Sequence, residues 1–244
     1  MRLRLLIAAL AAAGLSACAP APPRDAAAVE SLGMQAAQTH RPEALQRLAR
    51  WAEAGGPLAP LAARELGLAL ARDAAQADEA VRWLTRAAEA GDAEAAFTLG
   101  EAHRGGGLGW RPDAAAARPW FARAMQAGHA GATLALALAA RNGDGVPRDA
   151  RQCVSLLELA ARRGNARAMY LLSQAYAQGE GTPPDAGLAR HWLEQAAEQH
   201  LPAAMQDWAL ALEDGRLGVQ LDAQAAREQW REAAEERRNR WNVR

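Results

Sequence analysis

The sequence predicts an all-α protein, an α-solenoid built from about five helix-turn-helix repeats. Apolar residues recur at i, i+3, i+4 spacing along most of the chain, and alanine, the strongest helix former, is abundant. The chain also repeats itself every 36 to 38 residues, which is the length of one helical hairpin with its turn. Because a single amphipathic hairpin cannot bury its own apolar face, we expect the units to stack on one another.

Residues 1–17 have the pattern of a signal peptide and take no part in the expected fold. Arg2 and Arg4 give a short positive region, and Leu3–Leu15 is an almost unbroken apolar run. A permanent membrane helix needs about 20 apolar residues, so this run is too short to be one. We therefore expect a secretion signal.

The sequence Leu15-Ser16-Ala17-Cys18 resembles the lipobox of bacterial lipoproteins. The resemblance implies that Cys18 is lipidated, becomes the mature N-terminus and anchors the protein through several acyl chains, palmitate among them. The next residue is Ala19 and not Asp, which by the same resemblance favours the outer membrane. The alternative is an ordinary signal peptide followed by a chance cysteine.

Residues 18–33 are predicted to be the lipidated cysteine and a flexible tether. The proline-rich stretch 19–30 disfavours helix and favours extended conformations. Residues 34–244 are predicted to form the solenoid, and the Glu- and Arg-rich end, Arg227–Arg240, suits a capping helix with a solvated outer face.

Each predicted unit carries a large apolar residue in its second helix and ends on a glycine. The first of these large residues is Trp83, and its counterparts follow at intervals of 37, 36, 36 and 38 residues. We expect these large side chains to be buried against adjacent hairpins. The counterparts are Trp120, Leu156, Trp192 and Trp230, and the closing glycines are Gly55, Gly91, Gly128 and Gly164.

A glycine-rich turn separates the two helices of each unit, and glycine supplies the positive φ that ends the first helix. An aspartate follows each turn, where its side-chain oxygen is placed to accept from the free N–H groups of the second helix. We expect these aspartates to be helix caps and not catalytic carboxylates. They are Asp113, Asp149, Asp185 and Asp222.

The combined pattern resembles the Sel1-like repeat family, a relative of the tetratricopeptide repeat. The resemblance rests on an Ala-x-x-x-Leu-Gly motif at Ala95–Gly100 and on the turn Gly143–Asp149, and it covers residues 42–239. It implies a right-handed solenoid whose first helices line a concave surface that binds proteins. One departure is His200, which replaces a closing glycine.

By resemblance to tetratricopeptide units, three positions of each first helix face the concave surface. They lie three residues before, one residue after and four residues after the small residue of that helix. We expect a protein partner, either a peptide or an amphipathic helix, to bind there. Counting from Gly100, Ala137, Ser173 and Ala209 gives the partner-binding residues Phe97, Glu101, Arg104, Leu134, Leu138, Arg141, Tyr170, Gln174 and Gln206.

Phe97, Leu134 and Tyr170 form an apolar row within this set, flanked by Arg104 and Arg141. Contiguous apolar surface usually marks an interaction site, so the row is predicted to be a groove for the partner. The alternative is that Phe97 and Tyr170 pack against the neighbouring hairpin.

No motif in the sequence predicts a catalytic residue, a metal site or a cofactor. The His-Glu-x-x-His spacing of zinc sites is absent, as are phosphate-loop and nucleophile-elbow motifs. His103 is expected to pack between helices. Cys153, without a disulfide partner in the mature chain, is expected to be a buried apolar residue.

The charge balance gives no reason to expect nucleic-acid binding. The chain carries 28 basic and 28 acidic residues, and removal of residues 1–17 takes away two arginines, which leaves 26 against 28. Nucleic-acid-binding proteins usually carry a basic patch or stripe instead.

Together these features predict a scaffold or adaptor for protein–protein interaction, lipid-anchored at the periplasmic face of the outer membrane. The resemblance offers envelope assembly, polysaccharide export or signalling as its setting. One alternative is a cell-wall-associated ligand-binding protein or a periplasmic enzyme, which needs a pocket with clustered titratable groups. Another is a purely structural role at the cell wall.

Overall fold

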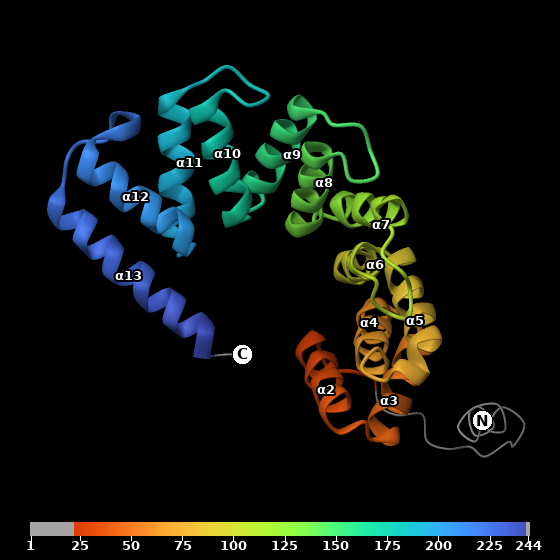
Figure 1. Cartoon of the computed structure of the whole chain (residues 1–244). Coiled ribbons are helices and arrows are strands. Elements are labelled where there is room, and N and C mark those ends of the chain that lie inside the picture. Colours follow the sequence, from red (N-terminus) through yellow and green to blue (C-terminus); the bar gives the residue numbers. More distant parts are fainter. Residues whose placement is uncertain (1–21, 243–244) are drawn as a thin grey trace, which may run out of the picture.

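The computed structural model describes residues 22–242, which fold into twelve α-helices and two short 3-10 turns. The predicted all-α class is confirmed. Six consecutive hairpins of this segment follow one another along a curved superhelix (Figure 1). The elements are α2 (Ala26–Thr39), α3 (Pro42–Ala54), α4 (Ala59–Leu70), η1 (Ala74–Gln76), α5 (Ala77–Glu89), α6 (Ala93–Gly105), α7 (Ala114–Gln126), α8 (Ala130–Asn142), α9 (Ala150–Arg162), α10 (Ala166–Gln178), α11 (Ala186–Glu198), α12 (Pro202–Asp214), η2 (Arg216–Gly218) and α13 (Ala223–Asn242).

The folded part begins earlier than the sequence predicted, so the boundary expected at residue 34 is wrong. The helix α2 starts at Ala26, and the Asp25 side chain accepts from the Ala28 N–H at 2.8 Å. Val29 is fully buried, and Gly33 packs closely against Glu65 of α4. The apolar contact with α4 therefore extends the helix into the predicted tether. Cys18 and the signal-peptide pattern lie outside the described residues.

Equivalent helices of successive hairpins run parallel. Glu94 in the first turn of α6 contacts His129, the N-cap of α8, and Glu30 of α2 lies 3.6 Å from Arg64 of α4. The molecule therefore has two different edges. The short-connection edge contains residues 55–58, 90–92, 127–129, 163–165 and 199–201, and the long-loop edge contains residues 40–41, 71–76, 106–113, 143–149, 179–185 and 215–222.

The predicted aspartate caps are confirmed. Three of them sit at N-cap positions in extended backbone, and each accepts from the N–H three residues later at 2.9 Å. Asp222 accepts in the same way from Ala225. Each cap satisfies one of the N–H groups that the first turn of a helix leaves free. The three N-caps are Asp113, Asp149 and Asp185.

The core positions of the second helices lie one residue after the predicted tryptophans. Trp83, Trp120 and Trp192 are only partly buried and pack at the margin of the core. The next residue in each of these helices is the buried one, and where the first helix has a glycine, this residue packs directly against it. A Cβ on Gly100 would lie 2.6 Å from the Phe121 ring. These buried residues are Leu84, Phe121, Leu157 and Leu193.

The apolar core divides into two clusters that meet inside α8, one within Val29–Ala132 and the other within Leu134–Ala233. Thr133 lies between them and is fully buried. Its hydroxyl donates to the His129 carbonyl oxygen at 3.0 Å and accepts from the Arg163 guanidinium at 2.8 Å. Hydrogen bonds therefore join the two clusters where apolar contact is interrupted.

Arginine side chains connect each of three second helices to the second helix before it. Every one of these arginines donates to a carbonyl oxygen in the last turn of the preceding helix. The bond places positive charge at the negative end of the helix dipole. The Ala88 and Met125 carbonyl oxygens also accept from the backbone N–H groups of Gly91 and Gly128. The pairs are Arg86 with Ala52 at 3.2 Å, Arg123 with Ala88 at 3.3 Å and Arg163 with Met125 at 2.9 Å.

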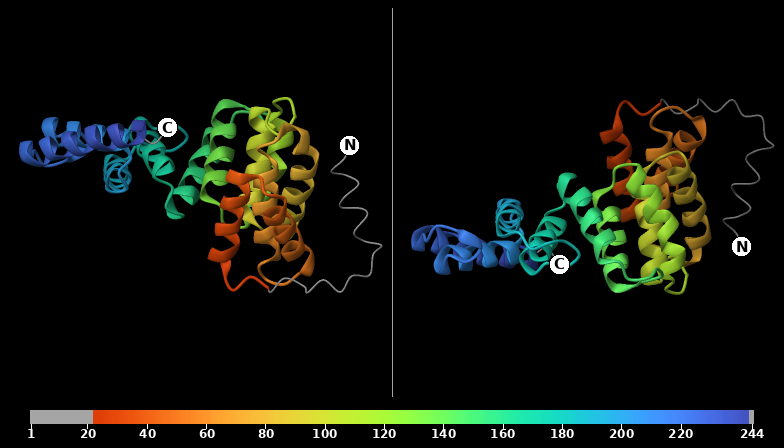
Figure 2. Two further views of the ribbon diagram at one scale, coloured as in Figure 1. Left: turned by 90° about the horizontal axis from the view of Figure 1, so that it is seen from below. Right: turned by 90° about the horizontal axis from the view of Figure 1, so that it is seen from above.

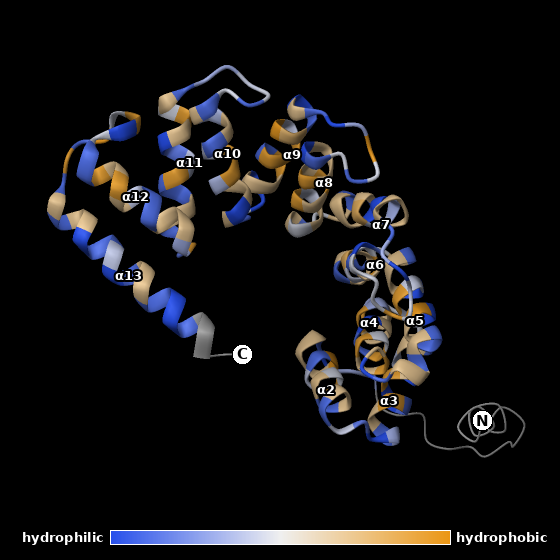
Figure 3. Ribbon diagram, viewed as in Figure 1, coloured by the Kyte–Doolittle hydropathy of each residue, from blue (hydrophilic) through white to orange (hydrophobic). Residues whose placement is uncertain are grey.

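The last helix has the composition predicted for a cap. Figure 3 shows α13 as predominantly hydrophilic, and only Ala226 and Ala233 of its described side chains are buried. Arg237 of α13 donates to the amide oxygen of Gln206 in α12 once that amide is oriented to accept. Within residues 22–242, no helix has both the length and the apolar character needed to cross a bilayer.

Candidate functional site

The nine predicted partner-binding residues lie on α6, α8, α10 and α12 and separate into two groups. The residue that lies three positions before the small residue of each helix makes contacts inside the molecule. The residues that lie after the small residue are more exposed. The first group is Phe97, Leu134, Tyr170 and Gln206, and the second is Glu101, Arg104, Leu138, Arg141 and Gln174.

Phe97 packs against the neighbouring hairpin, as the alternative interpretation held. Its ring lies 5.9 Å from the Phe121 ring and stacks on the His129 imidazole with centroids 4.3 Å apart. The His129 Nδ1 accepts from the Ala132 N–H at 3.0 Å, so this imidazole is also the N-cap of α8. Phe97 therefore helps to hold α8 against α6.

Tyr170 makes a similar bridge from α10 to α12. Its hydroxyl donates to the Asp207 carboxylate at 2.8 Å. Burial and the Asp207 hydrogen bond raise the pKa of the Tyr170 phenol to about 12. This side chain is partly buried and engaged with the next hairpin.

Leu134 does not belong to an exposed apolar row, so this part of the prediction is wrong. Only 8 % of it is exposed, and it belongs to the second core cluster. Because its side chain is buried in that cluster, Leu134 offers almost no contact area to a partner. The row of Phe97, Leu134 and Tyr170 is consequently not a continuous groove.

Arg64 was missed by the sequence analysis although it holds the same repeat position as Phe97. Its guanidinium lies 3.4 Å from the carboxylate of Asp92, the N-cap of α6, and 2.8 Å from Glu65. Gly67 is the small residue of α4, and counting back three residues from it identifies Arg64 as this position. The Arg64, Phe97 and Tyr170 side chains thus reach the next hairpin with ionic, aromatic and hydrogen-bonding contacts respectively.

The second group forms the best candidate surface, which we call the central strip: Glu101, Arg104, Leu138, Arg141 and Gln174. Arg104 is exposed and the other four are partly exposed. Glu101 and Arg104 pair with each other at 2.6 Å. The strip combines one apolar side chain with charged and amide groups on three successive first helices, an arrangement suited to a mixed-polarity segment of another protein.

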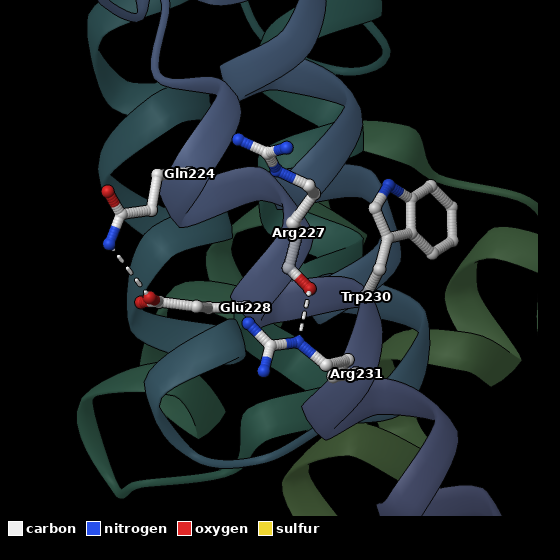
Figure 4. Close-up of a pocket in the computed structure, with 5 residues that line it drawn as sticks. All are labelled: Gln224, Arg227, Glu228, Trp230 and Arg231. Atoms are coloured by element: carbon white, nitrogen blue, oxygen red, sulfur yellow. Dashed lines mark hydrogen bonds between the residues drawn. The ribbon is translucent and has the colours of Figure 1, made fainter.

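Across residues 22–242, no three His, Cys, Asp or Glu side chains gather to hold a metal ion. Cys153 is buried as predicted, and burial raises the pKa of its thiol, which disfavours the reactive thiolate. A surface hollow on α13 is lined by side chains of that one helix, so no opposite wall encloses a ligand (Figure 4). Its lining is Gln224, Arg227, Glu228, Trp230 and Arg231.

His103 is partly buried, but its ring packs against the loop between α6 and α7 and not between helices as predicted. Its imidazole stacks on the Trp110 indole with ring centroids 3.8 Å apart. Burial lowers the pKa of His103, and the nearby Asp113 carboxylate opposes this shift only in part.

We expect His103 to make the protein less stable in mild acid. Well above pH 6.5 the residue is neutral in both states. As the pH falls through 6.5, the unfolded chain takes up the proton before the folded protein does, so stability falls with pH. Urea unfolding at pH 7.5 and pH 5.5 measures the loss. His103→Phe keeps the aromatic contact and is expected to lose this contribution to the pH dependence. An unchanged pH dependence in the variant contradicts the assignment.

Stacked helical hairpins with a continuous face of first helices define an α-solenoid repeat protein, a class that presents extended surfaces to other proteins. The Sel1 repeat pattern matches five consecutive segments, residues 60–92, 93–129, 130–165, 166–201 and 202–236. The chain therefore belongs to the Sel1 repeat family, and the predicted number of about five repeats is confirmed. This fold is a protein–protein interaction scaffold and is typically non-catalytic.

Solved structures agree with this assignment. A Sel1 repeat protein from Oxalobacter formigenes is 29% identical with a TM-score of 0.73, over 86% of this chain and 88% of that one. The protective antigen c5321 of uropathogenic Escherichia coli is 25% identical with a TM-score of 0.71, and the match covers 86% of this chain but 46% of the antigen. Comparison with curated proteins finds none that matches.

Proposed function

We propose that the protein is a non-catalytic scaffold that is lipid-anchored through Cys18 at the periplasmic face of the outer membrane and binds a protein partner along the central strip. The observation that carries the binding role is the exposure of this strip on three successive first helices of a Sel1 repeat solenoid. The lipobox-like residues before Cys18 and the Ala19 that follows support the anchor and its membrane. The setting we propose is envelope assembly, polysaccharide export or signalling.

The strip is a better binding surface than the predicted apolar row because more of its side-chain surface is exposed and its ion pair joins residues of a single helix. Leu138 is partly exposed, and Glu101 and Arg104 form only a local pair that a partner's charges can replace. Exposed ion pairs of this kind contribute at most about 1 kcal/mol, so opening one costs little. In contrast, Phe97 and Tyr170 would have to leave contacts that join neighbouring hairpins.

We expect the double variant Leu138→Asp with Arg141→Glu to lose its partner while keeping its helical content. The matched control is Ser155→Asp with Arg151→Glu, which makes the same charge change at exposed positions of α9. The measurement is affinity capture after mild crosslinking in intact membranes. A protein recovered with the wild type and the α9 control but lost with the strip variant supports the proposal. Equal recovery with all three forms contradicts the strip as the binding surface.

The anchor is tested separately with Cys18→Ser. We expect the wild type to float with outer-membrane vesicles and to incorporate a labelled fatty acid, and the variant to do neither. A wild-type protein that is released as a soluble periplasmic form contradicts the lipidation.

A further inference from the structure

We infer that the short-connection edge of the N-terminal hairpins lies against the bilayer surface and that the long-loop edge faces away from it. This inference rests on the proposed lipid anchor at Cys18. The surface concerned consists of the connections 55–58 and 90–92 with the last turns of α3 and α5. The partner for this surface is the headgroup layer of the membrane that holds the anchor.

The length of chain before the first helix limits how the solenoid can be oriented on the membrane. Residues 19–25 separate Cys18 from Ala26, where α2 begins. Seven residues fully extended span at most about 25 Å. The start of α2 must therefore stay within about that distance of the lipidated cysteine.

The start of α2 lies on the short-connection edge. Glu30 in α2 faces Arg64 in α4 at 3.6 Å, each about one turn from the start of its helix, so the two helices run in the same direction. The end of α3 lies on this edge too, since Ala52 of α3 bonds Arg86 near the end of the parallel α5. The chain thus enters the fold beside residues 55–58 and 90–92.

An orientation with the long-loop edge at the membrane would require the full length of residues 19–25. A helix of 13 residues is about 20 Å long. To bring the long-loop edge to the membrane, the seven residues would have to run back along all of α2, almost fully extended. That leaves little length to reach the headgroups, so the short-connection edge is the one that the tether holds near the bilayer.

The superhelix restricts this contact to the N-terminal hairpins. In both views of Figure 2 the helices at the C-terminal end run across the direction of those at the N-terminal end. The short connections 163–165 and 199–201 consequently turn away from the surface that 55–58 and 90–92 share.

Energy transfer from a dye on the protein to acceptor lipids tests the orientation. The intact lipoprotein, with the buried Cys153 replaced by alanine, is reconstituted into vesicles of phosphatidylethanolamine and phosphatidylglycerol. Glu89→Cys labels the short-connection edge and Arg111→Cys the long-loop edge, both at exposed positions. We expect transfer from position 89 to be at least about twofold more efficient, because the edges are one helix length apart, about 20 Å.

The control inserts forty Gly and Ser residues between Pro23 and Arg24. A flexible chain of that length has a root-mean-square span of about 35 Å, so the difference between the two labels should largely disappear. Equal transfer from both positions in the unmodified protein, or stronger transfer from position 111, overturns the orientation while the protein still floats with the vesicles. A protein that does not float overturns the anchor itself and the inference with it.

Discussion

Gly181→Ala is expected to lower the free energy of unfolding by about 3 to 4 kcal/mol. Gly181 lies in the loop between α10 and α11 with φ +76°, a conformation that costs an L-residue about 1 to 2 kcal/mol. A Cβ at this position would also lie 2.6 Å from the carbonyl carbon of Ala150, at the start of α9. Because that contact is with backbone, either the loop or the preceding repeat must move.

Gly164→Ala is the matched control for this substitution. Gly164 has φ +83°, but no atom outside its own neighbourhood lies within 4 Å of a built Cβ. Its replacement is expected to cost only the conformational part, about 1 to 2 kcal/mol. Urea unfolding followed by circular dichroism measures both values. Equal losses for the two variants would show that the loop of one repeat does not bear on the helix of the previous one.

Leu134→Asp is expected to destabilise the protein by about 4 kcal/mol or more, enough to unfold a large fraction at 37 °C. The substitution removes a leucine that is 8 % exposed and puts a carboxylate in its place within the second core cluster. The cavity and the buried charge add to one another.

Leu138→Asp separates burial from position on the repeat. Leu138 is one turn further along α8, partly exposed, and packs only at the margin of the second core cluster, so we expect a smaller loss of about 1 to 2 kcal/mol. Thermal unfolding of the two variants at the same pH gives the comparison. If Leu134→Asp is as stable as Leu138→Asp, then Leu134 is surface and the apolar row predicted from the sequence exists after all.

The fold was predictable because the same sequence pattern recurs in each repeat. The aspartate caps and the glycine turns recur at a constant spacing, so an error in one unit is corrected by the others. The start of α2 lacked this support, because its burial depends on the contact of Gly33 with Glu65 and not on a motif. The positive φ of Leu217 was equally unpredictable, since leucine does not favour that conformation. His200 is different, because it stands where the other units have a closing glycine at positive φ.

The candidate site was predicted only in part because the side chain at one repeat position can be used in two ways, for binding or for packing. A side chain three residues before the small residue faces the concave surface and also the next first helix. Which side it uses depends on what the next hairpin offers, such as the His129 ring for Phe97 or the Asp207 carboxylate for Tyr170. These pairings lie about 32 and 37 residues apart in the chain, and no local pattern encodes them.

The arginine bonds between second helices have a consequence for how such a chain can change in evolution. Their acceptors are main-chain carbonyl oxygens, which every amino acid provides, so Arg86 and Arg123 place no demand on the side chains of the preceding unit. Arg163 differs in part, because it also donates to the Thr133 hydroxyl. A unit that carries its own arginine can be duplicated, deleted or exchanged without a matching substitution next to it. Bonds to main-chain acceptors do not depend on the sequence of the preceding unit, so the surface residues of each unit can diverge independently.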